Sequence, residues 1–131
     1  MIVNLHTSDL KTFKGINNKY QSITLGNGNA VSPMEAVLLA AAGCSTIDIA
    51  MILEKMRQPV KSIDVQVEGQ RRDEIPKIFT KIHMHYTLTG NIKEKKVVEA
   101  IDLSLNKYCS VSIMLSESVE ISSSFNILTE A

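Results

Sequence analysis

Two cysteines are the residues of this sequence best suited to covalent chemistry. Cys44 lies inside a long apolar stretch, and Cys109 follows a lysine and a tyrosine much later in the chain. Two cysteines so far apart do not make the dense disulfide framework of a small secreted protein. In a reducing compartment such a pair is packed core, a set of metal ligands or a redox pair. These three interpretations remain open from the cysteines alone.

The stretch that carries Cys44 predicts a long helix with marked ends. Ser32 can cap the first free N–H groups, Pro33 suits the first helical position, and Glu35 completes a Ser-x-x-Glu capping box. Pro59 cannot continue a helix. Between these markers lie about 25 residues, or roughly 37 Å of helix. This helix should organise the rest of the fold.

The position of Cys44 does not by itself favour a reactive thiolate. Thiolates are stabilised at helix N-termini or beside cations, and Cys44 lies about 12 residues into the helix. Asp48 follows one turn later on the same face, where its charge would repel a thiolate. A cysteine in a buried helix often serves only as a small hydrophobe. A reactive Cys44 would need a cation from elsewhere in the fold or from a partner chain.

Glu35 is the nearest candidate acid on the same helix. Nine residues of regular helix separate its side chain from Cys44 by about 13.5 Å and half a turn. Capping is therefore its expected role, unless the helix starts later or a dimer brings it across. Cys109 is better placed, because it falls where one helix ends and another can start, so that free N–H groups could face its sulfur.

A separate hypothesis is a metal-binding protein whose candidate ligands are His83 and His85. These two imidazoles share one strand face, a spacing compatible with metal binding, but no third ligand stands out beside them. We therefore expect no metal and no other cofactor.

Composition narrows the class of protein. A chain of 131 residues with 44% hydrophobic residues predicts one domain over residues 1–131, with an aliphatic core because tryptophan is missing. Fourteen basic residues balance fourteen acidic ones, so no overall charge favours nucleic acid or an anionic membrane as partner. The N-terminus lacks the basic and apolar regions of a signal peptide, which predicts a cytoplasmic protein.

Hydrophobic periodicity predicts an α+β fold. An N-terminal β-meander precedes the long helix, and two strands, a second helix capped by Asn91, a short helix and a last strand follow it. The expected strands cover residues 1–6, 13–15, 20–25, 63–67, 82–88 and 119–127, and the later helices cover 91–108 and 110–117.

The long helix should be enclosed on every side. Ala36 to Ile47 carries no charge on any face, while Asp48 and several small polar residues argue against a membrane span. The other expected elements are too few to cover every face of this helix. We therefore expect a tightly built homodimer whose two long helices share one core.

Several segments resemble the OsmC/Ohr family, and in particular the branch often called YhfA-like. SPMEAVLLAAAGCSTID is similar to the family's central-helix motif, and LNKYCSVS resembles its second-cysteine segment. LEKMRQPV and EGQRRDEIPKIFTKIHMHY are similar to the YhfA-like branch. The resemblance covers nearly the whole chain, with both cysteines in their expected elements.

The resemblance implies a two-lobed intertwined homodimer and a thiol-dependent peroxidase for organic hydroperoxides. Cys44 would attack the hydroperoxide, Cys109 would resolve the sulfenate as a disulfide, and a dithiol would reduce that disulfide. Glu35 would be the acid of the site, although the family's acid directly follows the proline and here stands one residue later. The alternative is a non-enzymatic OsmC-like module that binds a small apolar ligand, with structural cysteines.

The N-terminal region departs from the peroxidatic pattern. Family members of that kind place an arginine in the first sheet to hold the thiolate and the peroxide. Residues 1–31 contain no arginine, only the three lysines Lys11, Lys14 and Lys19. A lysine holds a thiolate less specifically than arginine does, so the sequence predicts a slow first step.

Overall fold

The computed structural model describes residues 1–129 and divides into two compact units. The first unit is Met1–Val37 and the second begins at Leu38. The single domain expected over the whole chain stays a prediction.

The first unit contains the predicted β-meander. Its strands are β1 (Val3–His6), β2 (Thr12–Asn17) and β3 (Ser22–Gly26), antiparallel in that order. The Asp9 carboxylate closes the first turn by accepting the N–H groups of Lys11 and Thr12 at 2.9 and 2.8 Å. The third strand starts later than expected because Tyr20 lies in a turn with φ of 62°.

One side of this first sheet is apolar and exposed. Val3, Leu5 and Ile23 are all exposed, and they line a cavity of about 400 Å³ on the sheet. Contiguous apolar surface of this kind commonly marks an interaction site. Within its own unit this surface has no cover.

The long helix is α1 (Pro33–Lys55), and its start confirms the capping box. The Glu35 N–H donates to the Ser32 hydroxyl at 3.1 Å, and the Ser32 N–H donates to the Glu35 carboxylate at 2.9 Å. At the far end Arg57 adopts φ of 58°, and the Gln58 N–H reaches back to the carbonyl of Leu53 at 2.9 Å. The helix therefore ends at Lys55, before the Pro59 that the sequence marks as its limit but earlier than the expected end near Arg57.

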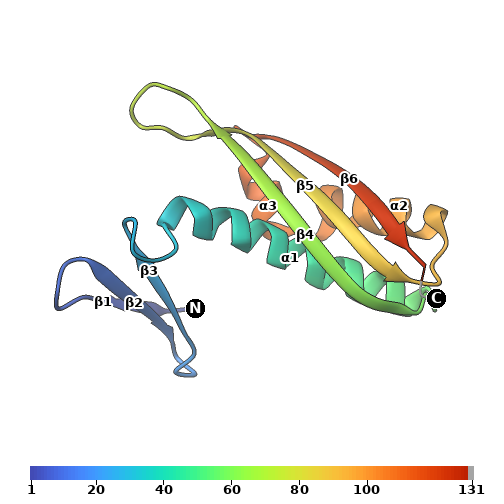
Figure 1. Ribbon diagram of the computed structural model, residues 1–131, viewed down its shortest axis with the longest axis horizontal. Coiled ribbons are helices and arrows are strands. Elements are labelled where there is room, and N and C mark those ends of the chain that lie inside the picture. Colours follow the sequence, from blue (N-terminus) through green and yellow to red (C-terminus); the bar gives the residue numbers. More distant parts are fainter. Residues whose placement is uncertain (130–131) are drawn as a thin grey trace. The chain divides into compact units, whose positions relative to one another are not determined.

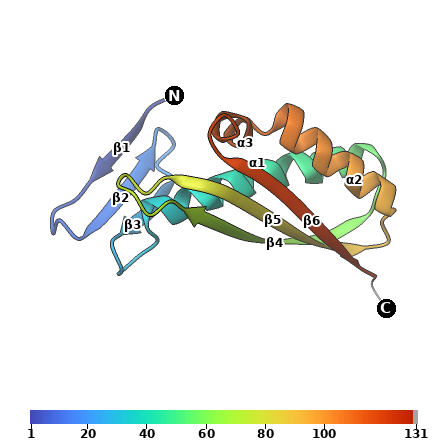
Figure 2. The same cartoon turned by 90° about the horizontal axis from the view of Figure 1, so that it is seen from above.

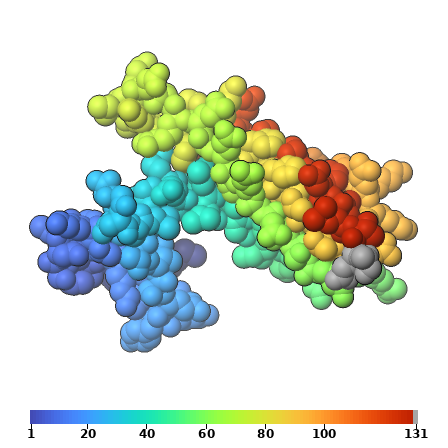
Figure 3. Space-filling view, viewed as in Figure 1, coloured from blue at the N-terminus to red at the C-terminus, as the bar shows by residue number. Residues whose placement is uncertain are grey.

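Within the second unit the described residues cover α1 on one side only. Its buried residues are Ala41, Ala42, Ser45, Ile49 and Leu53. Leu39, Ile47 and Met51 lie on another side, spaced along one stripe, and are 60%, 63% and 54% exposed. Figure 3 shows atoms of α1, in cyan to green, at the surface of the second unit. The described residues of the second unit thus do not provide the expected cover on every face.

Length and composition alone would allow α1 to cross a membrane. The buried central helix of a water-soluble protein can be equally long and apolar, so length and composition do not distinguish it from a membrane-spanning helix.

The second unit packs helices on one face of a three-stranded sheet. The strands are β4 (Val60–Arg71), β5 (Phe79–Gly90) and β6 (Glu120–Leu128), with β5 central, antiparallel to β4 and parallel to β6. The helical segments after β5 are α2 (Glu94–Leu103), a π-helical turn (Ser104–Tyr108) and α3 (Ser110–Leu115). They lie on the same side of the sheet as α1 (Figures 1 and 2). The predicted α+β order is confirmed.

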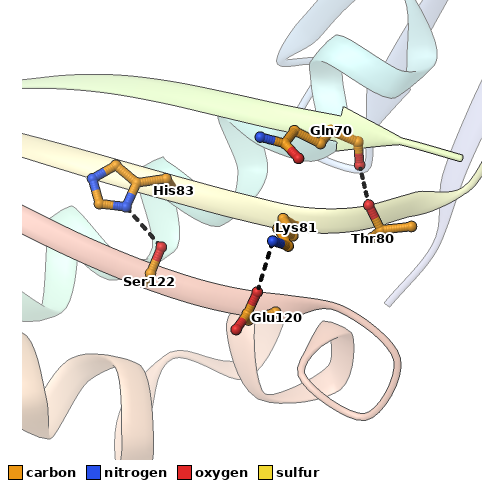
Figure 4. Close-up of polar contacts among 6 residues, drawn as sticks. All are labelled: Gln70, Thr80, Lys81, His83, Glu120 and Ser122. Carbon is orange, nitrogen blue, oxygen red and sulfur yellow. Dashed lines mark hydrogen bonds and ion pairs between the residues drawn. The ribbon is translucent and has the colours of Figure 1, made fainter.

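The central strand β5 provides the core. Ile82, Met84, Tyr86 and Leu88 are fully buried, which confirms the predicted inward face. The opposite face is polar, as Figure 4 shows for Lys81 and its ion pair across to β6. Alternation along the strand thus separates core from surface.

A glycine ends β5 where the chain backbones approach closely. Gly90 has φ of 145°, and a Cβ at this position would meet the carbonyl oxygen of Pro59. Only glycine fits this position without strain.

The second helix differs from the prediction at its start. Its N-cap is Lys93, without a side-chain cap, rather than Asn91. Gln58, from the end of α1, accepts the Lys93 N–H at 2.9 Å instead. A distant residue therefore replaces the local cap.

Tyr86→Phe is expected to lower the free energy of unfolding by about 1 kcal/mol. The Tyr86 hydroxyl lies 2.6 Å from the Ser45 hydroxyl inside the core. Ser45 would keep the Ala42 carbonyl at 3.2 Å as acceptor, so no buried group is stranded. Urea unfolding measures the change. Tyr20→Phe is the control, because Tyr20 is exposed; equal effects of the two changes would contradict the prediction.

Candidate active site

The structure brings Cys44 and Cys109 together. The two sulfurs and a carboxylate oxygen of Asp48 all lie within 4.8 Å of one another, and both thiols are free. Cys44 is half-buried on α1, whereas Cys109 is 0% exposed. The two cysteines therefore differ in access to solvent while sharing one site.

A π-helical turn delivers Cys109 to this site. The Cys109 N–H donates to the Ser104 carbonyl at 2.7 Å, which closes a turn one residue wider than an α-helical turn. Cys109 then leaves the helix with φ −75° and ψ 100°, and α3 begins at Ser110. The helix junction expected at Cys109 is confirmed. The widened turn carries no sequence signal that we recognise.

Polar groups of α3 and α1 surround the Cys109 sulfur. The Ser112 N–H donates to it at 3.4 Å, and the thiol reaches the Ser112 hydroxyl at 3.1 Å and the Ala41 carbonyl at 3.9 Å. The sulfur is thus held in one orientation next to α1.

Asp48 is held beside the sulfurs by a buried serine. The Ser104 hydroxyl lies within hydrogen-bond distance of both the Ser45 carbonyl, at 3.2 Å, and the Asp48 carboxylate, at 3.3 Å. From the sequence, Asp48 was expected on the same helix face as Cys44, where its charge would repel a thiolate. The contact between Ser104 and Asp48 could not be predicted, because it joins two helical segments that are far apart in the chain.

A small cavity opens beside the carboxylate. It has a volume of about 140 Å³ and is lined by Asp48, Met51, Ile52, Lys55 and Tyr108. Through it, a small molecule or ion can approach the Asp48 side of the cluster.

The site favours the neutral thiol of Cys109. Burial raises the pKa of Cys109, and proximity to Cys44 adds to this, while the hydroxyl and N–H of Ser112 oppose it. Among residues 1–129 the one ion pair within 4.0 Å joins Lys81 to Glu120, so Asp48 has no such partner there. No ion pair within the described residues therefore neutralises the carboxylate beside the two sulfurs.

Raising the pH is expected to destabilise the fold through Cys109. Its pKa in the folded state lies above the ordinary value of 9.0, so the stabilisation is complete below that pH and lost as the pH rises through the folded pKa. Cys109→Ser should therefore lose less unfolding free energy than the wild type between neutral and alkaline pH. Urea titrations at both pH values measure this, and identical losses would contradict the assignment.

Glu35 has a different role in the described structure. It belongs to the first unit, where its carboxylate accepts the Ser32 N–H. This bond, together with one from the Ser32 hydroxyl, lowers the pKa of Glu35. Glu35 is thus an ionised helix cap, as its spacing from Cys44 predicts, and its part in catalysis stays a prediction.

The two strand histidines are occupied by hydrogen bonds to β6. The ring nitrogens of His83 lie 2.7 and 2.8 Å from the hydroxyls of Ser122 and Ser124 (the first contact is drawn in Figure 4). His85 contacts Ser124 at 2.6 Å and Asn126 at 3.3 Å. Both imidazoles thus contact polar side chains of β6 on the outer face of the sheet.

Known proteins resemble this chain over most of its length. The family model described as OsmC-like protein matches residues 26–124. Protein YhfA of Escherichia coli (strain K12) is 45% identical over 112 residues, which cover 83% of this chain and 84% of that protein.

Solved structures extend the likeness to the fold. A hypothetical protein from Aquifex aeolicus VF5 superposes with a TM-score of 0.92 at 35% identity, covering 99% of this chain and 97% of that one. An organic hydroperoxide resistance protein OsmC from Legionella pneumophila shares the fold, with a TM-score of 0.72, 14% identity and 95% coverage of each chain. By sequence and by fold, the chain belongs to the OsmC-like protein family.

Proposed function

We propose that this protein is a thiol-dependent peroxidase that reduces organic hydroperoxides through Cys44 and Cys109. The observation that supports it best is the pair of free sulfurs in one site, one half-buried and one fully buried. A family relationship to proteins such as the organic hydroperoxide resistance protein of Legionella pneumophila agrees with a peroxide-related role.

The first step forms a sulfur–oxygen bond at Cys44. Its thiolate attacks the terminal oxygen of the hydroperoxide, the O–O bond breaks, and the alkoxide takes a proton and leaves as alcohol. The product is a Cys44 sulfenic acid. Cys44 is assigned this role because its half-buried position leaves it the more accessible of the two.

The second step forms a disulfide. The Cys109 sulfur attacks the sulfenic sulfur, the S–O bond breaks and water leaves with the Cys109 proton. The sulfurs already lie within 4.8 Å, so a bond of about 2.05 Å requires a modest approach. A small dithiol then reduces the disulfide by two electrons and restores both thiols.

A homodimer is part of this proposal. The exposed stripe of Leu39, Ile47 and Met51 on α1 is an apolar surface that a second copy would cover. In this proposal the partner also provides a cation to stabilise the Cys44 thiolate, because Asp48 has no ion pair within 4.0 Å among residues 1–129. A largely apolar pocket at this interface would favour a bulky organic hydroperoxide over hydrogen peroxide. A cytoplasmic location would keep the thiols reduced.

Steady-state consumption tests the proposal. Untagged protein should consume cumene hydroperoxide catalytically when a dithiol such as dihydrolipoate is supplied, and should consume hydrogen peroxide more slowly. The first step should be slow for a thiol peroxidase because the N-terminal arginine is missing from residues 1–31. No turnover by correctly folded protein with any dithiol would contradict the peroxidase and favour the ligand-binding module.

A further inference from the structure

We propose that Cys44, Asp48 and Cys109 together bind a thiophilic divalent cation, with Zn²⁺ as the best fit, in the reduced protein. This inference goes beyond the proposed peroxidase, because it requires only the three side chains and no hydroperoxide. It concerns the same sulfurs, so metal and oxidant would compete for them.

The donor set and its spacing suit zinc. Two thiolates and one carboxylate are ligands that Zn²⁺ accepts in tetrahedral sites, with Zn–S bonds of about 2.3 Å. Tetrahedral geometry then places two sulfurs about 3.8 Å apart. The three ligand atoms lie within 4.8 Å of one another, so small side-chain rotations would close the site. A fourth position stays open for water.

Groups behind the ligands already hold them in place. The Ser104 hydroxyl lies 3.3 Å from the Asp48 carboxylate, and the Ser112 N–H donates to the Cys109 sulfur at 3.4 Å. Metal ligands in proteins are usually oriented by such hydrogen bonds. The cavity beside Asp48 provides an entry path for a hydrated ion.

Charge gives the strongest reason for a cation here. The Asp48 carboxylate lies within 4.8 Å of both sulfurs, and no ion pair within 4.0 Å neutralises it among residues 1–129. A divalent ion would supply the missing positive charge. Binding would release the two thiol protons, so that Zn²⁺ and two thiols give a zinc dithiolate and two protons.

Metal and disulfide exclude each other at this site. Forming the Cys44–Cys109 bond removes both thiolate ligands, so oxidation would eject the ion. Conversely, bound Zn²⁺ would occupy the sulfur lone pairs and protect the thiols from peroxide. The metal-bound protein would therefore be a protected, inactive form.

Titration with Co²⁺ and Zn²⁺ tests the inference directly. Reduced, untagged protein should bind one Co²⁺ per chain with a sulfur-to-cobalt charge-transfer band, and Zn²⁺ should displace it. Asp48→Asn should weaken Zn²⁺ binding by at least about tenfold, and Cys44→Ser should weaken it more. Asp64→Asn, an exposed carboxylate on β4, is the matched control and should bind as the wild type does.

The disulfide form provides a second measurement that does not depend on a variant folding. Oxidised wild type should bind no Co²⁺ with a charge-transfer band and should recover binding after reduction. Binding that persists in the oxidised protein or in Cys44→Ser would overturn the site, as would no binding by reduced wild type. Because the readout is metal affinity, a failed peroxidase assay leaves this test intact, and a failed metal titration leaves the peroxidase standing.

Discussion

Cys44→Ser is expected to reduce the rate of organic hydroperoxide consumption by a factor of at least about 1,000. A serine hydroxyl remains protonated at neutral pH and is a poor nucleophile without an adjacent base. The group nearest to Cys44 that could serve as a base is Asp48, whose carboxylate is already engaged with Ser104. Stopped-flow mixing with cumene hydroperoxide measures the rate.

The matched variant Cys109→Ser should behave differently. It should still consume one equivalent of hydroperoxide and then stop at the Cys44 sulfenic acid, which excess oxidant would convert to the sulfinic acid. The hydroxyl is close to the thiol in size, so the buried position should remain filled. Rapid consumption by Cys44→Ser, or repeated turnover by Cys109→Ser, would contradict the assigned roles.

Ile47→Lys is expected to weaken dimerisation by at least about a hundredfold. Ile47 is 63% exposed in the single chain, at the centre of the apolar stripe on α1. Burying an isoleucine contributes about 1.5–3 kcal/mol, and a symmetric dimer loses this contribution twice. A lysine would also place a charge in the interface. Sedimentation velocity over a range of concentrations measures the shift.

Val98→Lys is the control for this change. Val98 is an exposed aliphatic residue of α2, outside the proposed interface. The Val98→Lys variant should sediment as the wild type does. A folded wild-type monomer at low concentration, or equal behaviour of both lysine variants, would show that the α1 stripe has another role.

Sequence patterns predicted the parts of the fold that depend on local chemistry. Three such features are present in the structure: the capping box of Ser32 and Glu35, the helix end before Pro59 and the alternation of buried and exposed residues along β5. Each follows from residues that are close together in the sequence. The elements that carry Cys44 and Cys109 were predicted for the same reason.

The contacts that complete the site could not be predicted, because they join distant segments. Ser104 reaches Asp48 across two helices, and the π-helical turn before Cys109 has no local signature. Gln58 caps α2 from the end of α1, where a local pattern favoured Asn91. The exposure of the apolar stripe on α1 could not be predicted either, because the sequence shows that a helix face is hydrophobic but not which element covers it.

The most direct test of the paired cysteines is the bond formed after one equivalent of hydroperoxide. Reduced, metal-free protein should be mixed with cumene hydroperoxide, alkylated, digested and analysed by mass spectrometry. We expect a disulfide between Cys44 and Cys109 of the same chain, with neither thiol alkylated. Two alkylated thiols, or a bridge formed only between chains, would contradict the redox pair.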